Sequence, residues 1–193
     1  MIIEDIEEAV LQRMDEVGAD NSSMNYPMAE MIKEATHELL RLAPLNYFMP
    51  SDFSDAKLIA NRDGTGRVVL PRDFIRLISF RMDGWHRPMT VLLNASDDSY
   101  KKQFHPLTRG GVVKPAIYRR NNELLYFSLP PDSKHELVEA LYLKNISALD
   151  DEFPKELQGA LVWLVAAKCL SVACDTDQSN VCYENYKNLI TQL

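Results

Sequence analysis

The sequence lacks a long apolar run and an apolar leader. Its longest apolar run, residues 160–174, covers about fifteen residues and contains Lys168, whereas a membrane-spanning helix needs about 20. The first three residues are followed directly by the acidic pair Glu4 and Asp5, unlike the basic and apolar start of a secretory signal. We therefore expect no membrane association and a protein that is soluble and intracellular when it is made.

Cysteine is scarce, and its spacing excludes the usual redox and zinc motifs. Cys169, Cys174 and Cys182 all lie near the C-terminus, and none of the four histidines is near them. The five-residue step from Cys169 to Cys174 fits neither a CxxC motif nor a zinc knuckle. We expect reduced, buried thiols with a structural role and no metal site.

The sequence also lacks every catalytic motif that we sought. The glycine pairs at residues 64–66 and 110–111 are not followed by the Lys-Ser/Thr of a phosphate loop, nor by a helix in a βαβ unit. No GxSxG, HExxH or zinc-deaminase signature occurs. We therefore name no catalytic, cofactor-binding or metal-binding residue and expect a protein that is not an enzyme and needs no cofactor.

Charge is present but unevenly distributed. Residues 1–56 carry 3 basic and 12 acidic side chains, residues 57–120 carry 13 and 5, and residues 121–193 carry 5 and 11. A basic middle between acidic ends suits a molecule that stacks on copies of itself, meets a charged neighbour or turns toward phosphate. The alternative is a solvated sheet face rich in arginine.

Both ends of the sequence show the three- and four-residue spacing of amphipathic helices. The predicted helices cover residues 3–17, 26–44, 154–173 and 179–193, and Gly18 with Asp20-Asn21 ends the first. Because the third is apolar nearly all round, we expect it to be the central helix of the fold or of an oligomer. His37 has polar neighbours and is expected to be exposed.

The middle of the sequence shows the two-residue period of strands. Hairpins are predicted for residues 57–70 across Asp63-Gly64 and for residues 115–129 across Asn121-Asn122. Between them, residues 94–109 are polar and suit a short helix or an excursion. Residues 135–143 suit a last strand that closes the sheet, with a helix as the alternative.

A strand at residues 74–82 forms the predicted spine of this sheet, which we place within residues 70–91. We expect Ile75, Leu77 and Ser79 on one face, and Phe74, Arg76, Ile78 and Phe80 on the other. Asp83-Gly84 turns the chain into residues 85–92. Before the sheet, residues 45–55 form a connector whose apolar side chains (Tyr47, Phe48, Met49 and Phe53) dock on the core.

The predicted fold class is α+β. Residues 1–55 and 146–193 supply N- and C-terminal helix pairs that form one helical bundle, and residues 56–145 form an inserted antiparallel β-rich subdomain.

Four stretches of the sequence resemble the head–tail connector, or adaptor, proteins of tailed bacteriophages. They are residues 63–77 (DGTGRVVLPRDFIRL), residues 84–88 with Gly84-Trp85 and Arg87-Pro88, residues 115–118 (PAIY), and residues 153–157 with Phe153-Pro154 and Glu156-Leu157. The chain is also similar to a neck ring protein of crass-like phages.

The resemblance implies a structural protein without catalysis. Such adaptors form a homo-oligomeric ring, often a dodecamer, beneath the portal protein. The ring extends the channel through which the genomic DNA passes and offers a platform to the next neck or tail protein. The protein would be made in the bacterial host cytoplasm and reside in the neck or tail of the virion.

Seven residues are candidates for the interface or for the channel lining: Arg72, Arg76, Arg81, Trp85, Arg87, Arg119 and Arg120. Trp85 is either an exposed contact residue or a packing residue at the end of the sheet. Tyr118 to Arg120 and Tyr126-Phe127 interleave aromatic and basic side chains, as single-strand binders do, but cross-strand packing in a half-buried sheet explains them more simply. The alternative function is a nucleic-acid-binding module that uses the basic β insert.

Overall fold

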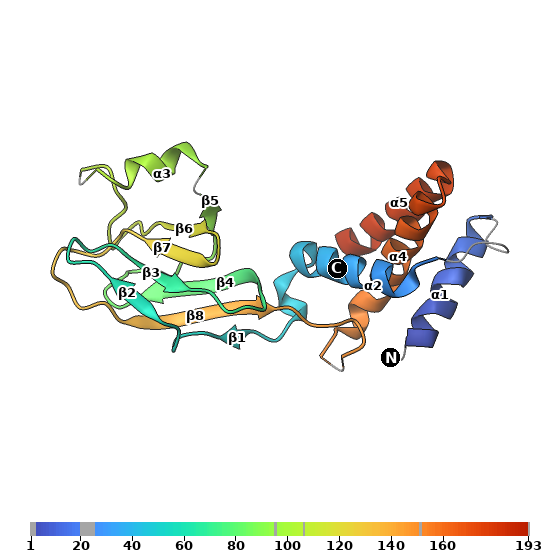
Figure 1. Ribbon diagram of the computed structural model, residues 1–193, viewed down its shortest axis with the longest axis horizontal. Helices are drawn as coiled ribbons and strands as arrows, with labels where there is room; N and C mark the ends of the chain where they lie inside the picture. The colour runs from blue at the N-terminus through green and yellow to red at the C-terminus, as the bar shows by residue number, and fades with distance from the viewer. Residues whose placement is uncertain (1–2, 20–25, 95, 106, 151, 193) are drawn as a thin grey trace. The chain divides into compact units, whose positions relative to one another are not determined.

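The chain divides into two compact units, which are described separately. The computed structural model describes residues 3–19, 26–94, 96–105, 107–150 and 152–192. The helical unit comes from Met1–Met49 and Asn145–Leu193, and the β unit is Pro50–Lys144 (Figure 1). Asp20-Asn21, predicted to end the first helix, and Leu193, predicted to end the last one, lie outside the described residues.

The helical unit contains the four predicted helices. They are α1 (Ile3–Glu16), α2 (Met28–Leu42), α4 (Gln158–Val172) and α5 (Thr176–Gln192), with the short 3-10 helices η1 (Leu45–Tyr47) and η2 (Lys155–Leu157). The first helix closes at Gly18, where the Ala19 N–H donates to the Met14 carbonyl at 3.0 Å. The last helix begins three residues before its predicted start at Ser179.

The apolar helix α4 is the centre of this unit, as its composition predicted. It packs against α1, α2 and α5, and most of its side chains are buried. The side chains Ile6, Val10 and Met14 of α1 are fully buried in the same unit. A helix that is apolar on all sides is stable only when neighbours cover all sides, and three helices do so here.

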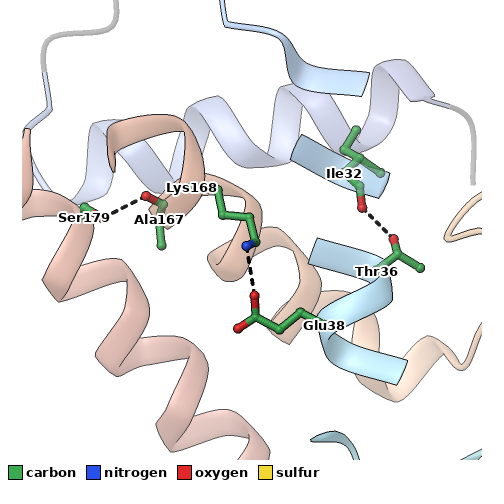
Figure 2. A network of polar contacts seen from close by, with 6 residues as sticks. All are labelled: Ile32, Thr36, Glu38, Ala167, Lys168 and Ser179. Carbon is green, nitrogen blue, oxygen red and sulfur yellow. Dashed lines mark hydrogen bonds and ion pairs between the residues drawn. The ribbon is translucent and has the colours of Figure 1, made fainter. Parts of the chain in front are cut away.

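Polar contacts join α4 to α2 and to α5 (Figure 2). The Lys168 ammonium lies 2.9 Å from the Glu38 carboxylate of α2. The Ser179 hydroxyl of α5 donates to the Ala167 carbonyl at 2.8 Å. Within α2, the buried Thr36 hydroxyl donates to the Ile32 carbonyl, so that no hydroxyl is left unpaired at this position.

The cysteine prediction is confirmed at two positions and wrong at the third. Cys169 and Cys182 are buried. Burial raises the pKa of Cys169 to about 12, and burial together with Asp175 raises that of Cys182 to about 11, so both thiols stay protonated. Cys174 is exposed, because it lies at the break between α4 and α5 and not on the buried face of a helix.

The β unit contains two sheets, not the single sheet that we expected. The three-stranded sheet has the order β1-β8-β4 and the five-stranded sheet the order β2-β3-β7-β6-β5. The elements are β1 (Ser51–Asp52), β2 (Leu58–Ala60), β3 (Gly66–Val69), β4 (Phe74–Met82), β5 (Leu93–Asn94), α3 (Asp98–Lys102), β6 (Ile117–Arg120), β7 (Glu123–Tyr126) and β8 (Leu137–Lys144). All pairings are antiparallel except that of β5 with β6.

Both predicted hairpins are confirmed, and their turns fall at the predicted residues. Strand β2 pairs with β3 and β6 pairs with β7. Asn121 adopts a positive φ of 53° and Gly64 one of 82°. A Cβ on Gly64 would lie 2.0 Å from the Leu129 carbonyl oxygen, so the turn needs glycine both for its backbone conformation and for space.

The extent of the spine strand β4 is predicted correctly, but its two faces are not. Phe74, Leu77, Phe80 and Met82 all belong to one buried cluster. The register of β4 against β8 shifts after Phe74, after Leu77 and after Arg81. The first two shifts leave Ile75 and Ile78 of β4 without a partner and reverse which face the following side chains of β4 occupy, whereas the third leaves Val138 of β8 without one. Simple alternation along β4 therefore fails.

The second half of the predicted spine is not a strand. Residues 85–92 contain one isolated bridge, between Phe80 and Met89. Residues 94–109 contain the short helix α3, one of the two alternatives, and residues 137–144 form the last strand, as preferred over a helix.

Two clusters form the core of the β unit. The larger one lies between the sheets and unites Val68 of β3, Phe80 of β4, Leu124 of β7 and Ala140 of β8. The smaller one lies on the opposite, outer face of the five-stranded sheet; Ala116, Tyr118 and Phe127 are its buried members, and Tyr100 of α3 packs against them.

The predicted connector at residues 45–55 includes η1 and the short strand β1. Phe48 and Phe53 are buried, as expected, and Phe53 belongs to the larger core cluster. Met49 does not dock, since its side chain is 83% exposed.

Candidate interaction surfaces

The six candidate arginines do not form a single site. Arg76 and Arg81 lie on β4 of the three-stranded sheet, and Arg119 and Arg120 lie on β6 of the five-stranded sheet. Arg72 and Arg87 lie in the segments before and after β4, and both are exposed.

The two arginines of β4 take part in the β unit itself. The Arg81 Nε lies 3.6 Å from the Glu139 carboxylate on β8, and the Ser79 hydroxyl donates to the same carboxylate. Arg76 is half-buried, and burial lowers its pKa. Both guanidinium groups are therefore engaged or partly shielded within the unit.

Arg119 bridges the two sheets while remaining exposed. Its guanidinium carbon lies 5.3 Å from the centre of the Phe74 ring on β4, a cation–π distance. Its Nε donates to the Asn121 carbonyl at 3.3 Å. This arginine therefore also stabilises the β unit.

Trp85 is a packing residue, and its candidacy as an exposed contact is wrong. Its side chain is 4% exposed and belongs to the larger core cluster. Its ring centre lies 5.8 Å from that of Phe80 in an edge-on arrangement. The turn at Asp83-Gly84 directs the chain back over the core, which buries the indole.

A hollow of about 280 Å³ lies on the outer face of the five-stranded sheet. We call it the aromatic hollow and define it by five of its lining residues: Arg67, Tyr100, Phe104, Arg120 and Phe127. The ring centres of Tyr100 and Phe104 are 5.1 Å apart, and those of Phe104 and Phe127 are 5.4 Å apart. One wall of the hollow is therefore aromatic.

Strand register explains why the two arginines share this face. Arg67 of β3 is opposite Leu125 of β7, and Arg120 of β6 is opposite Glu123, two residues along β7 from Leu125. Alternate residues of a strand share a face, as do residues paired across strands. The Arg67 guanidinium also lies 3.3 Å from the Glu123 carboxylate.

The sequence identified only part of this hollow. Arg120 was a candidate, and Tyr118 and Phe127 were noted as interleaved aromatics; Tyr118 is fully buried and Phe127 nearly so, which agrees with the packing alternative. Arg67, Tyr100 and Phe104 were missed. The one signal for Phe104 was an aromatic residue in an otherwise polar segment, which does not reveal that the side chain stays 65% exposed.

The helical unit has a larger, open groove of about 940 Å³ between α2 and residues 145–149. Ile32, Ile146, Ala148 and Leu149 give it a largely apolar lining, and His37 lies at its edge. His37 was expected to be exposed and is half-buried. Burial and then the nearby Arg41 lower the pKa of His37, so the ring is neutral at pH 7.

The fold is of the α+β class, with one hollow described on each unit. The chain matches the sequence model of the SU10 adaptor protein family over residues 1–193, and it belongs to that family of phage structural adaptors. Membership implies a place in the virion and association with other phage structural proteins. No curated protein matches the chain in sequence. None of the helices in the described residues has both the length and the apolar character needed to cross a membrane.

Proposed function

We propose that the protein is a non-catalytic head-to-tail adaptor that forms an oligomeric ring under the portal. The ring, of twelve copies, extends the DNA channel in the neck and links the portal to the next neck or tail protein. The family match over the whole chain carries this proposal. The resemblance to a neck ring protein of crass-like phages supports the same assignment.

The distribution of exposed apolar side chains supports assembly. Among the described residues, seven occur in the helical unit (Leu11, Leu42, Met49, Leu149, Val172, Val181 and Tyr183), and five in the β unit (Val91, Phe104, Leu107, Val113 and Val138). Single exposed apolar residues are common on monomers, but a ring subunit needs them on the surfaces that meet two neighbours, the portal and the tail.

Charge supports the same arrangement. The helical unit carries a net charge of −11 and the β unit +4. Units of opposite sign attract when the β unit of one copy meets the helical unit of another. DNA that must move through the ring should be bound weakly, and exposed arginines such as Arg72 and Arg87 would give weak, salt-sensitive contacts.

Negative-stain imaging of the purified chain with and without its portal protein tests the proposal. We expect rings on the portal, with or without rings of the free chain, and native mass spectrometry should give twelve adaptor copies per portal. A chain that stays monomeric at every concentration and does not bind the portal would contradict the proposed function.

A further inference from the structure

The aromatic hollow has the composition of the centre of a protein interface. Aromatic residues and arginine are the residue types enriched at interface centres and among their energetic hot spots. Phe104 is largely exposed, although a core aromatic would be covered. Arg120 is exposed and has no ion pair within the described part of the chain. An acidic and apolar partner would satisfy both side chains.

The surroundings favour a protein partner over DNA. The segment that follows α3 exposes Leu107, at 89%, and Val113. Phosphate groups gain little from aliphatic side chains, because affinity for DNA comes chiefly from basic contacts to the backbone.

Helix α1 carries the complementary surface. Glu4, Glu8, Leu11 and Asp15 follow each other at steps of four, three and four residues, so they form one stripe along the helix. All four are exposed, with Leu11 at 38%.

The spacing of the two charge sets agrees. Glu8 and Asp15 are two helical turns apart, about 10 Å along the axis. One strand separates β3 from β6, and the register offsets the two arginines by two residues along the strands. The Cα atoms of Arg67 and Arg120 are therefore about 12 Å apart, a difference that the long arginine side chains can span. Leu11 lies between Glu8 and Asp15, and a leucine side chain fits within about 280 Å³.

We infer that the aromatic hollow of one copy receives α1 of a neighbouring copy. Leu11 enters the hollow against Phe104, while Glu8 and Asp15 pair with Arg120 and Arg67. This contact rests on the proposed function, in which copies of the chain associate. We call it the joint; it connects the β unit of one copy to the helical unit of the next.

Charge reversal tests the joint in the full chain. We expect Arg120→Glu to weaken self-association by about ten-fold or more, measured by sedimentation velocity of the free chain at low salt or, for a chain that associates only on the portal, by the number of copies bound per portal. Arg87→Glu is the matched control, because Arg87 is exposed in the same unit but lies outside the hollow. Glu8→Arg should weaken association by itself and restore it in combination with Arg120→Glu. Wild-type association of the Arg120→Glu variant would overturn the inference.

Photo-crosslinking locates the partner directly. A photoreactive phenylalanine analogue in place of Phe104 should give crosslinks to α1 of a differently isotope-labelled copy. Crosslinks only to portal or tail protein would overturn the inference, and so would a loss of duplex DNA binding by Arg120→Glu with normal self-association.

The joint and the ring can fail separately. If Arg120→Glu forms rings on the portal as the wild type does, the joint is wrong and the proposed function stands. If pairs of copies form, are abolished by Arg120→Glu and are restored by Glu8→Arg, but no ring forms on the portal, the joint stands and the proposed function is wrong.

Discussion

The helical unit and the β unit differ in charge, in chain continuity and in the origin of their cores. The helical unit is acidic, is built from two distant segments and packs around one apolar helix. The β unit is basic, is a single stretch of chain and is held together by two sheets and a cluster of aromatic residues. These differences suggest that the stability of one unit depends on the other unit more than the reverse.

Because the β unit is one continuous stretch between the two segments of the helical unit, the helical unit depends on the folded β unit, but not the reverse. The β unit begins and ends side by side, since Ser51 of β1 pairs with Tyr142 of β8. When it is folded, it therefore brings the two segments of the helical unit close together. When it is unfolded, it becomes a loop of 95 residues, and closing such a loop costs on the order of 4 kcal/mol. Unfolding the helical unit has no comparable effect on the β unit.

Cavity-forming substitutions, one in each unit, should show this asymmetry with the largest effect. We expect Leu161→Ala to lower the free energy of unfolding of the helical unit by about 3 kcal/mol and Phe80→Ala to lower that of the β unit by about 4 kcal/mol, since both side chains are fully buried. Leu161→Ala should leave the stability of the β unit unchanged. In Phe80→Ala, by contrast, the helical unit should unfold at the same urea concentration as the destabilised β unit or at a lower one.

Each unit has its own fluorescent reporter for this measurement. Trp85 lies in the β unit and Trp163 in α4 of the helical unit, so Trp163→Phe and Trp85→Phe backgrounds report one unit each during urea denaturation. Val172→Ala, at an exposed position of α4, is the control for Leu161→Ala and should cost less than about 0.5 kcal/mol. A β unit that unfolds together with the helical unit in Leu161→Ala would contradict one-way dependence.

Two glycines test whether the positive φ of a turn or the lack of space for a Cβ costs the β unit more stability when glycine is replaced. Gly64 and Gly84 have nearly the same φ, 82° and 79°, but only Gly64 has a backbone neighbour where a Cβ would be. Gly84→Ala should cost about 1 kcal/mol for its backbone conformation alone. Gly64→Ala should cost roughly 2 to 4 kcal/mol, because overpacking is added. Equal costs in urea denaturation would show that the close approach to Leu129 is unimportant.

The same contrast explains what the sequence could predict. In the helical unit, the apolar spacing of α1, α2 and α4 predicted both the helices and the central place of α4, because a helix has one period throughout. In the β unit, the turns at Gly64 and Asn121 were predictable from local preference. The faces of β4 were not, because the two bulges in β4 depend on pairing with β8, about sixty residues away.

The candidate surfaces follow the same rule. Arginine content predicted Arg120, but exposure could not be derived from the sequence: Trp85 was expected at the surface or at the sheet end and is in the core, and Phe104 stays exposed in a polar segment. The aromatic hollow depends on β3, β6 and α3 meeting on one sheet face, and no local pattern specifies which strands become neighbours.

The smallest expected effect is a pH dependence of the free energy of unfolding of the β unit. The Tyr126 hydroxyl and His135 Nδ1 are 2.6 Å apart. Burial raises the pKa of Tyr126, so the tyrosine keeps its proton and donates to a neutral imidazole. Burial lowers the pKa of His135 below 6.5, an effect that Asp63 partly opposes.

The sign of the pH effect follows from that lowered pKa. About one pH unit or more above 6.5 the imidazole is neutral in both states and contributes no pH dependence. As the pH falls below this value, the unfolded chain binds a proton first, so the β unit loses stability on acidification. We expect a loss below about 0.5 kcal/mol between pH 7.5 and 5.5, because solvent screens a partly exposed ring. His135→Asn should remove this loss from the transition that Trp85 reports, and an unchanged pH slope in that variant would assign it to other groups.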